Sequence, residues 1–183
     1  MRTLFLSVIM LAGCAAAAPP QRYVERRTDM TPAPRGADLF RDAMLRGHNA
    51  ARAAVEVAPL SWDDRLAADA AAYAATLARE HRFEHAVQPR GPGREGENLW
   101  MGTRGAYRYD EMVGGWVDER RWYRAAPTPN FSTTGRWGDV AHYTQIVWRG
   151  TTAVGCALAS DAESDYLVCR YGPPGNVVGE RAF

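Results

Sequence analysis

Hydrophobic positions recur along the first half of this chain with the spacing of helices. Between residues 37 and 54, Leu39, Phe40, Met44 and Leu45 fall near the spacing of one helix face. After Pro59, a more regular apolar stripe appears, made of Leu66, Ala67, Ala70, Tyr73, Ala74 and Leu77. Asp63 or Ser61 can cap the start of this stripe. The pattern therefore predicts two helices, and the alanines of the second one permit close packing.

A third helix is predicted after a glycine- and proline-rich loop at residues 88–96. It runs from Tyr107 or Tyr109 to Tyr123, and its apolar face consists of Met112, Val113, Trp116 and Trp122. Residues 125–140 form a long loop rich in Pro, Thr and Gly. Loops of this length without structure of their own are uncommon and often functional.

The last third of the chain changes from helical spacing to strands. A short helical segment at His142–Trp148 precedes two predicted strands, Ala153–Ser160 and Tyr166–Tyr171, with a polar turn between them. Helices that flank an antiparallel sheet are typical of a layered α+β domain. With 183 residues, of which 46% are hydrophobic, the chain can bury one core of this kind.

The N-terminus has the pattern of an export signal. Arg2 precedes the apolar run Leu4–Ala12, which is too short to span a bilayer. The run leads to Leu11-Ala12-Gly13-Cys14, which resembles a bacterial lipobox, a signal in which the cysteine is lipidated and becomes the first residue. We expect a lipoprotein signal peptide at 1–14, lipidation at Cys14, a flexible tether at 15–36 and one domain at 37–183. A plain secretory signal cleaved near residues 16–18 is the alternative.

This anchor predicts a location in a bacterial cell envelope, with the membrane as a partner. Ala15 rather than Asp follows the cysteine, which favours the outer membrane, with the domain facing the periplasm or the exterior. Lys and Arg number 22 against 21 Asp and Glu, a formal net charge of +1. This balance gives no indication of a nucleic-acid partner.

Three cysteines are present, and lipidation of Cys14 leaves Cys156 and Cys169 as a pair. An oxidising compartment lets them form a disulfide between the two predicted strands. The chain-entropy model gives roughly 3 kcal/mol of stabilisation for a loop of this size. Two buried free thiols are the alternative.

Two signatures identify a family resemblance. Residues 142–148 (His-Tyr-Thr-Gln-Ile-Val-Trp) and residues 166–177 (Tyr-Leu-Val-Cys-Arg-Tyr-Gly-Pro-Pro-Gly-Asn-Val) closely resemble the paired signatures of the CAP superfamily. That superfamily includes cysteine-rich secretory proteins, antigen-five allergens, group-one pathogenesis-related proteins and bacterial members. The resemblance covers about residues 37–178 and implies a three-layer α-β-α sandwich with a short antiparallel sheet between helices.

The resemblance also implies a cleft with two histidines and two glutamates. His142 opens the first signature, and Glu97 lies in a Gly-Glu-Asn motif at residues 96–98. Glu119 ends a Trp-Val-x-Glu motif, and His85 lies in Phe-Glu-His-Ala at residues 83–86, where relatives often have Ser in place of Ala. Such a nitrogen and oxygen set suits Zn or another divalent metal. Without metal, the four groups would form a hydrogen-bonded cluster.

Three functions are compatible with the resemblance. The first is a non-enzymatic binding or envelope-interaction module for a small-molecule, lipid or protein ligand, which we favour over an enzyme. The second is a zinc-dependent hydrolase, such as a protease, in which a glutamate serves as the base. The third is a sterol or lipid carrier, with an apolar groove under residues 125–140. Fold alone does not choose among them.

Two other patterns in the sequence contain histidines. His81, Glu84 and His85 read His-x-x-Glu-His, the inverzincin pattern, but they fall where the second helix should end. His48, Asn49 and Arg52 match a first-helix element of the family, for which we predict a packing and hydrogen-bonding role.

Overall fold

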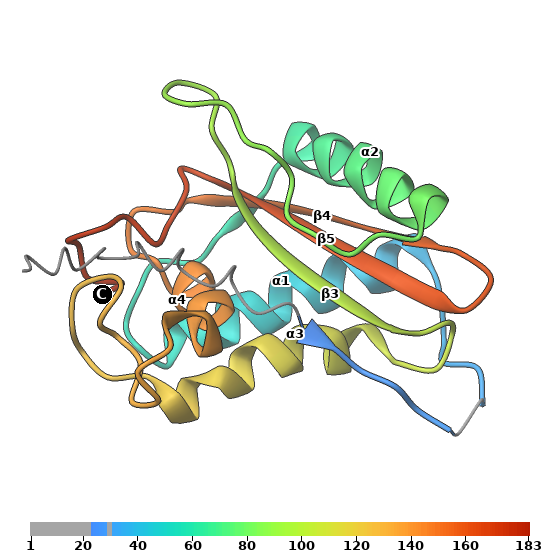
Figure 1. Cartoon of the computed structure of the whole chain (residues 1–183), viewed down its shortest axis with the longest axis horizontal. Helices are drawn as coiled ribbons and strands as arrows, with labels where there is room; N and C mark the ends of the chain where they lie inside the picture. Colours follow the sequence, from blue (N-terminus) through green and yellow to red (C-terminus); the bar gives the residue numbers. More distant parts are fainter. Residues whose placement is uncertain (1–22, 29–30) are drawn as a thin grey trace, which may run out of the picture.

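The computed structural model describes residues 23–28 and 31–183, so the predicted signal peptide, Cys14 and residues 15–22 of the tether lie outside it. One helix covers one face of a sheet, and three helices cover the other face (Figure 1). This is the predicted three-layer α-β-α sandwich. The helices are α1 (Ala37–Ala53), α2 (Asp64–Glu80), α3 (Tyr109–Asp118) and α4 (Ala141–Ile146), with 3₁₀ turns at Glu119–Trp122 and Trp137–Asp139.

The sheet of the described residues has five strands in the order β1-β3-β5-β4-β2. The three central strands are antiparallel, as predicted, whereas the two-residue outer strands pair in parallel with their neighbours. Strand bounds are Tyr23–Val24 (β1), Ser61–Trp62 (β2), Gly96–Thr103 (β3), Ala153–Ser160 (β4) and Ser164–Gly172 (β5). Strand β3 was not predicted, because its buried positions do not alternate.

Helix α2 forms where its apolar stripe predicts it and packs on one face of the sheet. The Asp63 side chain accepts a hydrogen bond of 2.9 Å from the Leu66 amide and caps the helix. A β-carbon at Gly155 would collide with the backbone at Ala67, so β4 can approach α2 only because this position is glycine. Alanines and Leu77 fill the interface, as the composition of the helix predicts.

The third helix is shorter than predicted. It ends at Asp118, and residues 119–122 continue as a tighter 3₁₀ turn. Each residue advances about 120° in a 3₁₀ helix and about 100° in an α-helix, so four residues shift the buried face by about 80°. Met112, Val113 and Trp116 are buried as predicted, but Trp122 is 43% exposed, and its predicted burial is wrong.

The ordered fold begins before residue 37. Val24 pairs with Met101 in the sheet, and Arg35 donates a 2.6 Å hydrogen bond to the Tyr107 carbonyl. Arg27 forms a 3.0 Å ion pair with Glu111. The prediction of a flexible tether therefore does not hold for residues 23–28 and 31–36, which pack on the domain.

Cys156 and Cys169 form a disulfide, as predicted. They lie directly opposite each other on β4 and β5, with Cα atoms 4.1 Å apart. Within residues 23–28 and 31–183, no helix has the length and apolar content needed to cross a bilayer.

Candidate functional site

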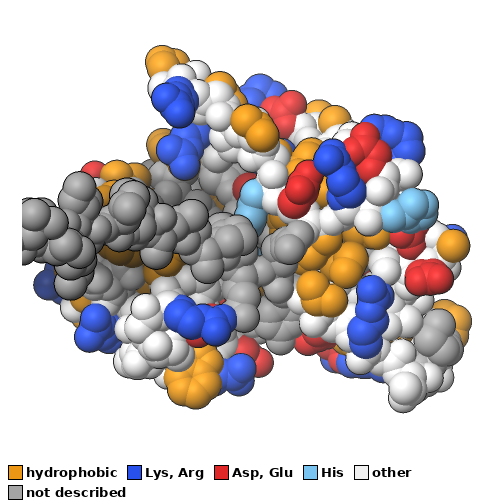
Figure 2. Space-filling model, in the orientation of Figure 1, with side chains coloured by type: hydrophobic (Ala, Val, Ile, Leu, Met, Phe, Trp, Pro, Cys, Tyr) orange, Lys and Arg blue, Asp and Glu red, His pale blue; other side chains and the backbone are white. Residues whose placement is uncertain are grey.

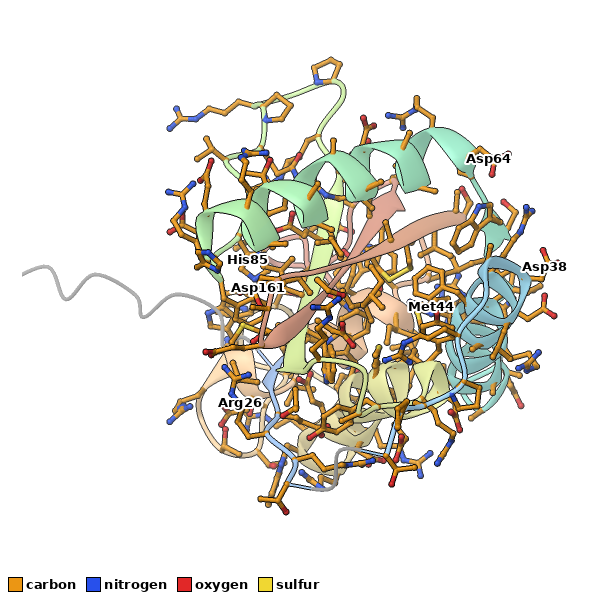
Figure 3. The ribbon with its side chains drawn as sticks, turned by 90° about the vertical axis from the view of Figure 1, so that its right-hand side faces the viewer. Arg26, Asp38, Met44, Asp64, His85 and Asp161 are labelled. Carbon is orange, nitrogen blue, oxygen red and sulfur yellow. A yellow bond between two sulfur atoms is a disulfide. The ribbon has the colours of Figure 1, made fainter. Side chains whose placement is uncertain are left out.

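A cleft of about 450 Å³ opens where the start of β3, helix α4 and two loops meet. The loop between α2 and β3 supplies His85 and the residues up to Arg94, and Figure 3 shows His85 just after the end of α2. The lining residues that matter below are His85, Gln88, Arg90, Arg94, Glu95, Glu97, Trp137 and His142. A volume of this size suits a small-molecule ligand.

Glu119 holds His142 at the back of the cleft. The Glu119 carboxylate accepts a 2.6 Å hydrogen bond from His142 Nδ1 and further bonds from the amides of His142 (3.1 Å) and Tyr143 (3.2 Å). The Trp116 ring stacks on the imidazole at 5.9 Å between centroids, with an interplanar angle of 21°. The carboxylate thus fixes the ring nitrogen that carries the proton, and Nε2 is left for the cleft.

Glu97 holds His85 in the same way. His85 Nδ1 and the Ala86 amide donate to Glu97 Oε1 at 2.6 Å and 3.0 Å. Arg170 Nη2 lies 2.9 Å from the other carboxylate oxygen. His85 Nε2 is buried and has no hydrogen-bond partner among the described residues. A buried polar atom of this kind needs an explanation, because leaving it unsatisfied costs free energy.

The two pairs show what the predicted tetrad does. His85, His142 and Glu97 line the cleft, whereas Glu119 supports His142 from behind and does not line it. A carboxylate on Nδ1 with Nε2 left free is the usual arrangement of a metal-binding histidine. The described residues contain no group of three or more His, Cys, Asp or Glu side chains placed to hold an ion. The donor set therefore fits two histidine ligands supported by two carboxylates, not four protein ligands.

The signature residues around the tetrad shape the cleft. A β-carbon at Gly96 would overlap the Gln145 side chain, so this glycine lets β3 and α4 approach each other. Gln145 in turn accepts a 2.9 Å hydrogen bond from the Gly175 amide, and Asn98 donates a 3.1 Å bond to the His142 carbonyl. Their positions in the two motifs were the only signal for these roles.

The inverzincin pattern does not form a site. Helix α2 ends at Glu80, and His81 takes a left-handed backbone conformation (φ 50°), so His81 and His85 do not share a helix face. His81 pairs instead with Asp161 at 2.9 Å, outside the cleft, and its side chain is 71% exposed.

His48 and Arg52 have the structural role predicted for them. Arg52 is 1% exposed and donates hydrogen bonds to the carbonyls of Ala58, Ile146, Trp148 and Thr151 at 2.6–2.9 Å. Both ring nitrogens of His48 are used, Nδ1 by the Met44 carbonyl (2.7 Å) and Nε2 by the Tyr171 hydroxyl (2.8 Å). Burial lowers the pKa of His48 to about 4, so the ring is neutral near pH 7.

The charges at the mouth of the cleft were not anticipated from the sequence. Glu95 is 8% exposed in its side chain and forms ion pairs with Arg65 (2.7 Å) and Arg170 (3.5 Å). Arg90 and Arg94 line the cleft and are exposed, and no described residue pairs with either guanidinium. Their only signal in the sequence is that they are the charged residues of the loop at 88–94.

Comparison with known proteins supports the resemblance. The family model "CAP: Cysteine-rich secretory protein family" matches residues 45–171. Pathogenesis-related protein 1C of Nicotiana tabacum is 40% identical over 141 residues, which are 76% of this chain and 78% of that protein. Pathogenesis-related protein PRMS of Zea mays is 37% identical over 142 residues, which are 76% of this chain and 80% of that protein.

A solved structure shares the fold as well. The crystal structure of NaASP2 with Zn2+ superposes with a TM-score of 0.65 at 24% identity and covers 80% of this chain and 86% of that one. At this level of identity, the likeness concerns the fold.

Proposed function

We propose that this chain, which belongs to the CAP family of cysteine-rich secretory proteins, is an exported binding module whose cleft holds a divalent metal ion. His85 and His142 would bind the ion through Nε2. Glu97 and Glu119 would fix the two rings from behind. The bound ion would supply positive charge and open coordination positions for an oxygen or nitrogen of a ligand.

One observation carries this proposal. His85 Nε2 is buried and has no partner in the part of the chain that the structure describes, while Nδ1 of the same ring is held at 2.6 Å by a carboxylate. A first-row divalent ion matches such a nitrogen because imidazole is among its preferred ligands. NaASP2, which shares the fold, was crystallised with Zn2+, so zinc is the first ion to test.

The geometry favours a binding role over the zinc-dependent hydrolase. A hydrolase of that type needs a carboxylate free to take a proton from water. Glu119 already accepts three hydrogen bonds, and Glu97 accepts two and pairs with Arg170. Proton uptake by either glutamate would require it to give up these contacts.

A sterol or lipid carrier receives less support from the loop at residues 125–140. Phe131 and Val140 of this loop are fully buried, so the loop contributes apolar side chains to the core. The lining of the cleft includes four charged side chains, those of Arg90, Arg94, Glu95 and Glu97, beside apolar residues such as Pro89 and Trp137. Both features suit a polar ligand better than a sterol.

Export and anchoring are part of the proposal. The lipobox-like residues 11–14 and the disulfide are its support, because disulfides persist in oxidising compartments. In a bacterial host, Cys14→Ala should move the protein from the membrane fraction to the soluble fraction. Unchanged fractionation together with unlipidated wild-type protein would contradict the anchor.

The metal proposal is tested by calorimetric titration of the purified, metal-free protein with zinc. We expect saturable binding near one ion per chain, lost in His85→Ala and in the His85→Ala/His142→Ala double variant. His81→Ala is the matched control, because His81 also pairs with a carboxylate but lies outside the cleft. Circular dichroism establishes that each variant is folded.

Two results would overturn the metal site. One is the absence of zinc binding to the wild-type protein. The other is binding that survives in a folded His85→Ala variant. Loss of binding in His81→Ala alone would place the ion at the Asp161 pair instead.

A further inference from the structure

We propose that the ligand of this cleft is an anion, recognised through a phosphate or carboxylate group by Arg90 and Arg94. The inference deepens the proposed function, since it assumes that the same cleft is the binding site. It concerns the loop between α2 and β3, which projects from the molecule (Figure 1) and carries arginine side chains, coloured blue in Figure 2. The charged residues of this loop at positions 88–94 are both arginines.

The first step is that both carboxylates of the cleft lining already have arginine partners. Glu95 and Glu97 are the carboxylates among the lining residues. Glu95 forms ion pairs with Arg65 at 2.7 Å and with Arg170 at 3.5 Å, and Glu97 pairs with Arg170 at 2.9 Å. The Glu95 and Glu97 side chains are only 8% and 5% exposed and Arg170 is 7% exposed, so the two pairs with Arg170 are weakly screened by solvent. Arg65 is 66% exposed and also pairs with Asp69 at 3.0 Å.

The second step is that the unpaired charges are positive. Arg90 and Arg94 line the same cleft, and neither guanidinium has a partner among the described residues. With both glutamates paired to arginines, these two charges are left uncompensated. A cleft lined by one sign of charge attracts ligands of the opposite sign.

The third step is the chemistry of the guanidinium group. Its planar fork matches the paired oxygens of carboxylates and phosphates, and such charge-assisted bonds are stronger than neutral ones. The Arg90 and Arg94 side chains stand at the exposed mouth, whereas His85 and His142 lie deeper in the cleft. An anion at the mouth would therefore leave the two histidines to the metal ion.

The fourth step concerns hydrogen bonding in the interior. The amides of Asn98 and Gln145 are engaged with backbone groups and Thr151, so they offer little to a ligand. The groups that remain include the two guanidinium groups, the Gln88 side-chain nitrogen and the histidine Nε2 atoms. A neutral sugar or a cation would find few suitable partners in this set, whereas an oxyanion finds two strong donors.

The test is calorimetry on purified, metal-free protein with three probes: inorganic phosphate, succinate, and phosphatidylglycerol vesicles against phosphatidylcholine vesicles. The variant is Arg90→Gln/Arg94→Gln. The matched control is Arg41→Gln/Arg46→Gln, which removes the same charge from the exposed face of α1. We expect the loop variant to weaken binding at least about tenfold, since it removes the charge-assisted hydrogen bonds of both guanidinium groups.

The outcomes distinguish a free anion from a lipid headgroup, and they distinguish failure of the anion proposal from failure of the metal site. Phosphate or succinate binding that depends on the loop arginines identifies a free anion, and dependence seen only with phosphatidylglycerol identifies a lipid headgroup. Failure of all three probes, or equal binding by a folded loop variant, overturns the inference. Zinc is then titrated into the same loop variant. If the loop variant binds zinc and the wild type binds no anion, only the anion proposal is rejected. If the wild type binds an anion but no zinc binds, only the metal site is rejected.

Discussion

His48 and His85 bond to adjacent positions of the β3–β5 pair, Tyr171 and Glu97, but they use their ring nitrogens in different ways. At His48, both ring nitrogens are hydrogen-bonded at 2.7 Å and 2.8 Å, and the side chain is fully buried. At His85, one nitrogen is held by a glutamate at 2.6 Å, and the other is buried without a described partner.

This difference separates a structural histidine from a binding one. A ring with both nitrogens satisfied has no capacity left for a ligand, and desolvation keeps it neutral. A ring held on one side by a carboxylate keeps the other nitrogen oriented and available. Changes at the first site should therefore affect stability, and changes at the second should affect binding.

The largest loss of stability is expected at Arg52, beside His48. Arg52→Met would leave four carbonyl acceptors without their donor, three of them from residues 146–151. We expect the free energy of unfolding to fall by at least about 3 kcal/mol, measured by chemical denaturation. Arg46→Met, on the same helix but exposed, should change it by about 0.5 kcal/mol or less. A loss below about 1 kcal/mol for Arg52→Met would contradict the structural role.

His48 predicts a dependence of stability on pH. Its pKa is about 4 in the folded protein, against about 6.5 when exposed, so the unfolded chain binds more protons between these values. The contribution of His48 is complete above pH 6.5 and is lost as the pH falls toward 4. Its total is about 3 kcal/mol.

The measurement is a series of denaturation curves between pH 4 and 7.5 for the wild type and His48→Gln. The difference in unfolding free energy between the two proteins should shrink as the pH falls. A difference that is constant with pH would show that His48 is not held neutral.

Glu119→Gln should lower both the stability of the fold and the affinity for zinc, with a loss of stability between those at Arg52 and at His85. Glu119 accepts hydrogen bonds from the His142 ring and two amides, and the amide group of Gln presents donors where an acceptor is needed. We expect a loss of about 1–3 kcal/mol in unfolding free energy and zinc binding weakened about 10- to 100-fold. Glu80→Gln, a surface change, is the control. An unchanged zinc affinity in Glu119→Gln would argue against an orienting role.

His85→Ala should have the smallest effect on stability. The side chain is 27% exposed, and one of its nitrogens contributes no hydrogen bond. We expect a change of about 1 kcal/mol or less without metal. The stabilisation that zinc gives the wild type should vanish, as thermal unfolding with and without zinc would reveal. A large loss of unfolding free energy in the absence of metal would show that His85, like His48, has a structural role.

The sequence predicts the fold well, because α2 and the β4–β5 pair carry strong local patterns. It misplaces Trp122, since the change from an α-helix to a 3₁₀ turn after Asp118 has no signal in the hydrophobic spacing. It also treats residues 23–36 as free, because their pairing with β3 and with Tyr107 comes from tertiary contacts.

The four residues of the candidate site could be named from short family motifs, but their geometry could not be predicted. The motifs name His85, Glu97, Glu119 and His142 without telling which atoms face one another. Only the folded chain shows that each glutamate accepts a hydrogen bond from an Nδ1. Arg90 and Arg94 belong to no motif. Their proposed role in anion binding depends on the ion pairs that Glu95 and Glu97 form with other arginines.

The most direct test of the comparison follows the imidazole nitrogens by ¹⁵N nuclear magnetic resonance during a zinc titration. The chain has four histidines, so every ring can be assigned. The account predicts that Nε2 of His85 and His142 shift together near one equivalent of zinc, while their Nδ1 atoms stay protonated and His48 and His81 do not respond. Unmoved signals from His85 and His142, or a response at His48, would contradict it.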